Sequence, residues 1–119
     1  MDADNLALAE RWAELFNNDV DALIDELYDP ECTVFGSRLG HDRLRAFEQR
    51  VLAAAPRRAA RVHAMHASGD VVVVEGVLVD PDQGAEWKLP FCAVLTWCDG
   101  RIVNDNTYAE FSKWPGMKA

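Results

Sequence analysis

Residues 86–110 read EWKLPFCAVLTWCDGRIVNDNTYAE, and this stretch indicates the fold more clearly than any other part of the chain. Two long runs of strand-forming residues flank Asp99-Gly100, a pair that tolerates the positive φ angles of a type I′ hairpin turn. The second run carries Asn104, Asp105 and Asn106, where a strand over a core would allow apolar residues. These three residues therefore predict either a solvent-exposed strand or polar groups inside a pocket.

The chain before this hairpin carries three helical patterns and then more strands. Apolar residues at spacings of three and four predict a helix up to Phe16, a second from Asp19 to Asp29-Pro30, and a third from about Asp42 to Pro56. A short strand is expected at 32–35, and the β-rich part of the chain supplies two long strands at 59–68 and 71–79. Helices followed by long antiparallel strands are typical of an α+β domain.

The predicted architecture is a cone-shaped, curved antiparallel sheet wrapped around three N-terminal helices. The open end of such a cone is a natural pocket for a small molecule. The chain has 119 residues, half of them hydrophobic, which suits one domain spanning 1–119 with a real core.

The charge of the chain excludes several classes of partner. A formal net charge of −8 argues against nucleic acid, whose phosphates require clustered Lys and Arg, and it disfavours anionic membranes. No apolar run is long enough to span a bilayer, and the acidic N-terminus lacks the pattern of a signal peptide. We therefore expect a cytoplasmic protein with no nucleic-acid or membrane partner.

Neither the cysteines nor the histidines form a metal-binding pattern. Cys32, Cys92 and Cys98 are odd in number and lack CxxC spacing, which predicts reduced side chains rather than a disulfide framework or a zinc site. His63 and His66 are three residues apart, so on a strand they point to opposite faces. We predict no metal and no organic cofactor.

The order of elements resembles the nuclear transport factor 2-like superfamily, also called cystatin-like α+β barrels. The segment 16–36, Gly40, the Pro-containing strand around Pro90, the turn Gly100-Arg101-Ile102 and the closing Tyr108-Ala109-Glu110 carry the resemblance. Within the superfamily, the chain looks most like the branch of SnoaL-like polyketide cyclases and limonene-epoxide hydrolases. The superfamily hosts enzymes, binding modules and scaffolds, so these motifs imply a fold and leave the activity open.

The catalytic sets of two related enzyme types are missing from this chain. Limonene-epoxide hydrolases use five polar residues, and the matching positions here are Val34, Gly36, Gly76, Leu78 and Thr107. The Asp base, Tyr and protonated Asp of ketosteroid isomerases fall on Gly36, near Arg11 and near Ala93. Antibiotic cyclases use a single Asp at a position that matches Thr107, and Asp105 lies two residues earlier on the same face.

Asp105 is therefore the candidate acid/base residue. If it points into an apolar cone, desolvation raises its pKa and makes it a usable base near neutral pH. The competing interpretation is an exposed strand carboxylate or an interface residue. Tyr108 and Tyr28 are candidates to orient a ligand, although a tyrosine at position 108 more often closes the sheet.

An apolar wall for a flat hydrophobic ligand is the second prediction, with plain core packing as the alternative. Its predicted ligand-binding members are Val34, Gly76, Leu78, Trp87, Leu89 and Phe91, with Tyr28 at the border. The sequence thus supports a small-molecule enzyme resembling SnoaL-like cyclases and isomerases, acting on an apolar carbonyl ligand. The alternative is a non-catalytic ligand-binding or dimerisation module of the same fold.

A homodimer is expected in either case, because the resemblance implies packing through the outer face of the sheet. Alternation along the strands suggests Val72, Val94, Thr96 and Cys98 as outward positions. Together they would form an apolar patch larger than a monomer normally exposes.

Overall fold

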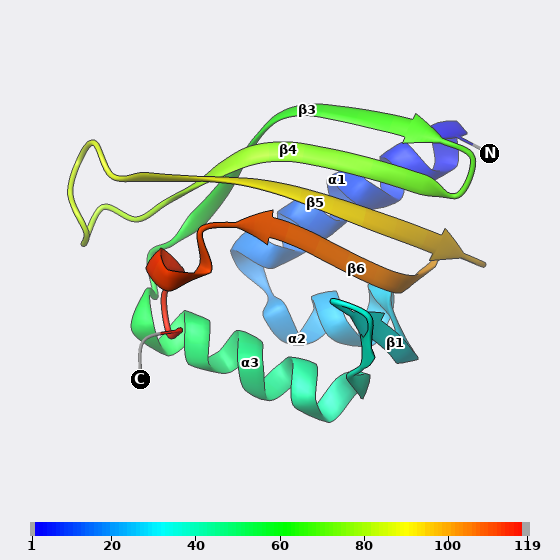
Figure 1. Ribbon diagram of the computed structural model, residues 1–119, viewed down its shortest axis with the longest axis horizontal. Helices are drawn as coiled ribbons and strands as arrows, with labels where there is room; N and C mark the ends of the chain where they lie inside the picture. The colour runs from blue at the N-terminus through cyan, green and yellow to red at the C-terminus, as the bar shows by residue number, and fades with distance from the viewer. Residues whose placement is uncertain (1, 118–119) are drawn as a thin grey trace.

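A computed structural model describes residues 2–117 of the chain, with its α-helices on one side of a curved sheet (Figure 1). The helices are α1 (Asp2–Asn18), α2 (Val20–Ala22), which continues into the π-helical turn η1 (Leu23–Leu27), and α3 (Gly40–Ala54). The strands are β1 (Tyr28–Val34), β2 (Ser37–Arg38), β3 (Ala59–Ser68), β4 (Val71–Val79), β5 (Lys88–Cys98) and β6 (Arg101–Ala109), and a short 3-10 helix, η2 (Phe111–Lys113), follows them.

The six strands form one sheet in the order β2-β1-β6-β5-β4-β3. The α+β class and the cone are confirmed, but the sheet is mixed rather than purely antiparallel, because β1 runs parallel to β6. The first strand also begins at Tyr28, earlier than predicted. The helical turn of η1 leads directly into this strand, and Pro30 sits inside the strand instead of ending a helix before it.

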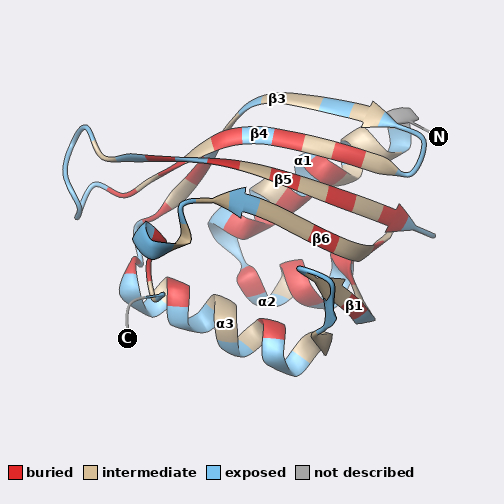
Figure 2. Ribbon diagram, in the orientation of Figure 1, coloured by how far each residue is buried: buried red, intermediate tan, exposed pale blue. Residues whose placement is uncertain are grey.

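The hairpin that indicated the fold has the predicted turn. Asp99 and Gly100 have φ angles of 51° and 79°, as a type I′ turn requires, and Cys98 pairs with Arg101 across it. On β5, the buried positions 89, 91, 93, 95 and 97 alternate with more exposed ones. Buried residues therefore line the face of the sheet that covers the helices (Figure 2).

The helices attach to two different parts of the sheet. α1 packs against β3 and β4, and α3 packs against β1 at the other side of the cone. The C-terminal turn closes the space between α3 and the sheet, because Trp114 packs edge-on against Phe91 and the backbone of Arg50 lies against Gly116. Among the helices that the structure describes, none is both long and apolar enough to cross a membrane.

Gly76 lies on β4 opposite the β-bulge in β3. Val62 pairs with Gly76 and Ala64 pairs with Glu75, so His63 is the extra residue of the bulge. The bulge brings the carbonyl oxygen of Arg61 so close to Gly76 that a Cβ atom there would overlap with it, and the Phe91 ring would lie 3.1 Å from the same Cβ.

We therefore predict that Gly76→Ala lowers the free energy of unfolding by about 2 kcal/mol, as expected for overpacking against a backbone that cannot move aside. Urea denaturation followed by tryptophan fluorescence measures the change. Gly69→Ala is the control, because a Cβ at Gly69 meets no atom within 4 Å and adds only the left-handed strain of about 1 kcal/mol. Equal losses in the two variants would contradict the predicted overlap.

Candidate functional site

A β-bulge decides where Asp105 points. Trp97 pairs with Ile102 and Thr96 pairs with Asn104, so Val103 is an extra residue in β6. Each residue of a regular strand alternates in direction, and one inserted residue reverses the alternation beyond it. Ile102 and Asp105 consequently both face the interior, and Asp105 is only 7% exposed although its side chain is ionisable.

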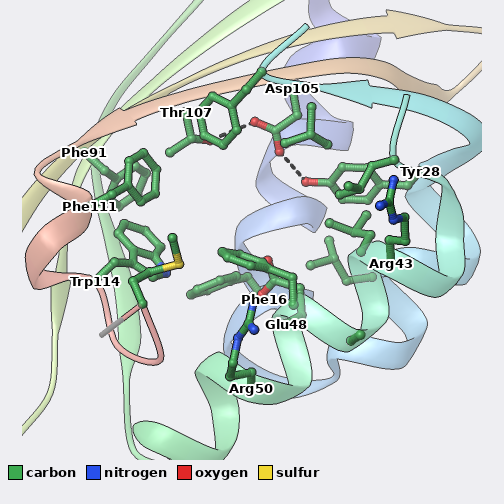
Figure 3. A pocket seen from close by; sticks show the side chains of 18 of the residues that line it. Phe16, Tyr28, Arg43, Glu48, Arg50, Phe91, Asp105, Thr107, Phe111 and Trp114 are labelled. Carbon is green, nitrogen blue, oxygen red and sulfur yellow. Dashed lines mark hydrogen bonds between the residues drawn. The ribbon is translucent and has the colours of Figure 1, made fainter. Parts of the chain in front are cut away.

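Both carboxylate oxygens of Asp105 accept hydrogen bonds from hydroxyl groups. The Tyr28 hydroxyl donates to Oδ2 at 2.6 Å, and the Thr107 hydroxyl donates to Oδ1 at 2.7 Å. Trp12 in turn donates from Nε1 to the Tyr28 hydroxyl at 3.0 Å. Trp12, Tyr28 and Asp105 come from α1, β1 and β6, so this chain of hydrogen bonds links Asp105 to both the helices and the sheet. Figure 3 shows the bonds of Asp105 with Tyr28 and Thr107.

Burial and hydrogen bonding act in opposite directions on Asp105. Removal from solvent raises the pKa of the Asp105 carboxyl above its ordinary value, while the hydrogen bonds from Tyr28 and Thr107 partly oppose that rise because they stabilise the ionised form. Burial and the neighbouring Asp105 charge raise the pKa of Tyr28 well above its usual range. Tyr28 therefore stays protonated and remains a hydrogen-bond donor.

A cavity of about 560 Å³ lies beside this carboxylate, between the sheet, α3 and the C-terminal turn. This volume is in the range of pockets that hold small organic ligands. Most of the surrounding side chains are apolar or aromatic: Trp12, Phe16, Leu23, Val34, Phe35, Leu39, Leu44, Ala46, Phe47, Ala60, Leu78, Phe91, Phe111, Trp114 and Met117. The polar ones are Tyr28, Arg43, Glu48, Arg50, Asp105 and Thr107.

Glu48 is a second carboxyl group in the cavity, and the sequence reasoning did not identify it. Burial raises the pKa of Glu48 to about 7, the nearby Arg58 guanidinium opposes the rise, and the Asp105 charge adds to it. The sequence contains a pattern that indicates this position. Glu48 follows Leu44 by four residues and precedes Val51 by three, so it lies within the apolar face of α3.

The structure places five of the sequence-predicted site residues on the cavity: Tyr28, Val34, Leu78, Phe91 and Asp105. Tyr108 does not join them, and this corrects the prediction. It is 61% exposed, because it lies three residues after the inward-facing Asp105 and therefore on the outward face of β6. Its hydroxyl therefore cannot orient a ligand in this cavity.

Three predicted members of the apolar wall also lie away from the cavity. Gly76 lies against the Arg61 carbonyl and does not line the cavity. Leu89 is buried in the hydrophobic core opposite Leu78, and Trp87 only packs against the edge of that core before β5 begins. For Leu89, plain core packing was the correct interpretation.

Val72 requires a correction of a different kind. It was expected on the outer face of the sheet, but it is completely buried, because the even-numbered residues of β4 face the helices. Val94, Thr96 and Cys98 do face outward, as predicted. The outward valines of β4 are the odd-numbered Val71, Val73, Val77 and Val79.

A curved sheet closed over three helices, with a polar cluster inside an apolar cavity, defines a protein of the nuclear transport factor 2-like class. Residues 9–104 match the SnoaL-like domain, and the chain belongs to this family. No curated protein matches the chain.

Solved structures of similar shape support the same class. IdmH from Streptomyces antibioticus, proposed to be a polyketide cyclase, is 17% identical with a TM-score of 0.80, covering 92% of this chain and 94% of its own. A proposed SnoaL-like polyketide cyclase from Jannaschia sp. CCS1 is 16% identical with a TM-score of 0.77, covering 92% and 87%. AclR from Streptomyces galilaeus, proposed to be a hydroxylase, is 15% identical with a TM-score of 0.76, covering 93% and 92%. At these identities the likeness shows the fold alone.

Proposed function

We propose that this protein is a small-molecule enzyme that performs acid/base chemistry on an apolar, carbonyl-containing ligand. The observation that carries the proposal is Asp105: a carboxylate enclosed by an apolar cavity, held by two hydroxyl donors, with a raised pKa. A base of this kind is suited to proton transfer near neutral pH. The proposed cyclase activities of IdmH and the Jannaschia protein agree with this class of reaction.

The proposed reaction begins with removal of a proton from a carbon next to the ligand carbonyl. Asp105 takes the proton, and the electron pair of the broken C–H bond forms the C=C bond of an enolate. In an isomerisation, the protonated Asp105 returns the proton to another carbon of the enolate. In an aldol cyclisation, the enolate carbon attacks a second carbonyl of the same ligand, and Asp105 protonates the resulting alkoxide. Neither route uses a metal or an organic cofactor.

Tyr28 has a positioning role in this proposal. Its hydroxyl accepts from Trp12 and donates to Asp105, so it holds one carboxylate oxygen in a fixed direction. A carboxylate has about four lone-pair directions, and the two hydroxyl donors occupy only part of them. Asp105 therefore retains the capacity to accept a proton from a ligand.

A non-catalytic ligand-binding module is the second candidate. One observation favours it: both oxygens of Asp105 already have protein donors, an arrangement that also suits a carboxylate with a purely structural role. The absence of the catalytic sets of limonene-epoxide hydrolases and ketosteroid isomerases points the same way.

Binding of prodan, a flat fluorescent aromatic ketone, separates the two candidates. If Asp105 faces the ligand, its protonated form donates a hydrogen bond to the ketone, and we expect binding to tighten by about tenfold as pH falls from 8 to 5. Asp105→Asn should weaken the pH dependence of the dissociation constant, and the dependence that remains belongs to the Glu48 carboxyl in the same cavity. The control is Asp70→Asn in the exposed turn between β3 and β4. A wild-type dissociation constant that does not change with pH would favour the binding module.

We further propose a cytoplasmic homodimer that packs through the outer face of the sheet. The partly exposed Val71 and Val73 of β4 pair with Thr96 and Val94 of β5 on that face, and the three cysteines are free thiols, as in a reducing compartment. Native mass spectrometry of the freshly purified protein tests the dimer and reports any bound small molecule by its mass. A monomer across micromolar concentrations would contradict the interface.

A further inference from the structure

Glu48 is a half-buried titratable group that the reaction above does not use. It lies on α3 and lines the same cavity as Asp105, which reaches the cavity from β6 (Figure 3). The two carboxyl groups therefore come from opposite layers of the fold, the helix and the sheet. The Asp105 charge acts on Glu48, because it helps to raise the pKa of the Glu48 carboxyl.

The surroundings of the two carboxyl groups differ in their hydrogen-bond donors. Asp105 has a hydroxyl donor on each oxygen, which favours its ionised form. The Oε2 atom of Glu48 is shielded from solvent, although the residue as a whole is only half-buried, and it has no hydrogen-bond partner within residues 4–117. An enclosed carboxyl oxygen without a donor favours the protonated form.

The charged groups around Glu48 do not remove this difference in hydrogen-bond donors between Asp105 and Glu48. Arg58, which follows α3, attracts the Glu48 charge, but its guanidinium donates to the Phe16 carbonyl at 3.1 Å and stacks over the Phe16 ring at 4.3 Å. It forms no ion pair with Glu48 in the described part of the chain. Arg43 and Arg50 also line the cavity from α3, with exposed side chains. Asp105 and the Tyr28 hydroxyl face Glu48 from the sheet.

Resting on the proposed function, we propose that Glu48 is the second proton-transfer group of the cavity, the acid that protonates the ligand's carbonyl oxygen while Asp105 removes the proton from the neighbouring carbon. The ligand class is then an enolisable ketone whose oxygen faces α3 and whose acidic C–H bond faces β6. A saturated hydrocarbon or an ester without such hydrogens would bind without reacting.

The step balances in atoms and charge. Asp105 accepts the carbon-bound proton, the C–H electron pair becomes the C=C bond, and the carbonyl π electrons form an O–H bond with the proton of Glu48. The ligand becomes a neutral enol, and the negative charge moves from Asp105 to Glu48. No additional charge arises in the apolar cavity, where an unpaired charge is costly.

Hydrogen exchange into 2-tetralone tests the proposal, because its C1–H bond lies next to a ketone on a flat, apolar bicycle. Exchange in D2O is followed by the loss of the C1 proton signal in NMR spectra between pH 5 and 9. We expect a bell-shaped profile for the wild type: the rising limb requires ionised Asp105, and the falling limb near pH 7 follows the loss of the Glu48 proton. Glu48→Gln should lower the maximum by about tenfold and remove the falling limb.

The controls separate this proposal from the function on which it rests. Glu86→Gln, in the exposed loop before β5, should keep the wild-type rate and profile. If Asp105→Asn loses exchange while Glu48→Gln keeps the wild-type rate and falling limb, the role of Glu48 is wrong and the proposed function stands. If the wild type exchanges no faster than buffer, both are wrong. Circular dichroism verifies that each variant is folded.

Discussion

Asp105→Asn should reduce the exchange of the 2-tetralone C1 proton by about 10²-fold or more at pH 7, the usual contribution of a general base. Asparagine keeps the shape of the side chain but cannot accept the proton. The change is expected in the rate rather than in the fold, because the carbonyl oxygen of the introduced amide still accepts from one of the two hydroxyls, Tyr28 or Thr107. Exchange rates at saturating ketone, measured by NMR, give the size of the loss.

The matched control is Asp70→Asn, which makes the same chemical change in an exposed turn where asparagine is well tolerated. We expect its exchange rate to equal that of the wild type. An Asp105→Asn protein that retained more than half of the activity would assign the carboxylate to structure and would favour a binding module. A loss of folding in Asp105→Asn, seen by circular dichroism, would call for Asp105→Glu, which restores a carboxylate but shifts its position.

The main strands could be predicted from the sequence because each signal is local. The Asp99-Gly100 turn needs only two adjacent residues with positive φ, and the alternation of apolar residues along β5 needs only neighbours in the same strand. The pairing of β1 with β6 could not be predicted in this way. Its parallel direction depends on contacts between segments about seventy residues apart, and no local pattern encodes them.

The direction of the Asp105 side chain, like the pairing of β1 with β6, could not be predicted from a local sequence pattern. Ile102 and Asp105 are three residues apart and would point to opposite faces of a regular strand. They share the inner face only because Val103 bulges from β6, and a bulge forms through the register of two paired strands. The sequence thus supplied the residue type, while the fold decided that Asp105 faces inward and Tyr108 outward. Glu48, by contrast, could have been identified from the sequence, because its spacing from Leu44 and Val51 places it within the apolar face of α3.

The second large effect concerns stability rather than rate: Glu48→Gln should make the protein more stable than the wild type at pH 8. The folded protein holds the Glu48 proton more tightly than the unfolded chain does, because its pKa rises from 4.5 to about 7 on burial. The resulting stabilisation is complete below pH 4.5 and is lost as pH rises through 7. At about 1.36 kcal/mol per pH unit, this loss amounts to about 3 kcal/mol.

Glutamine does not ionise, so the variant lacks this loss. We expect the difference in unfolding free energy, variant minus wild type, to increase by about 2.5 kcal/mol between pH 5 and pH 8. Urea denaturation at the two pH values measures it, with the fluorescence of the buried Trp12, Trp97 and Trp114 as the signal. Asp105 is present in both proteins, so its own contribution to the pH dependence largely cancels from the difference.

Glu86→Gln provides the baseline, because its exposed side chain should leave the difference in unfolding free energy unchanged between the two pH values. A Glu48→Gln difference that also stayed constant would mean that Glu48 ionises normally in the folded protein, and it would remove the acid from the proposed reaction. A difference that increases with pH, as expected, would instead mean that ionisation of Glu48 makes the wild-type protein less stable above pH 7. A stability cost of this kind is common where a buried group is kept for function rather than for packing.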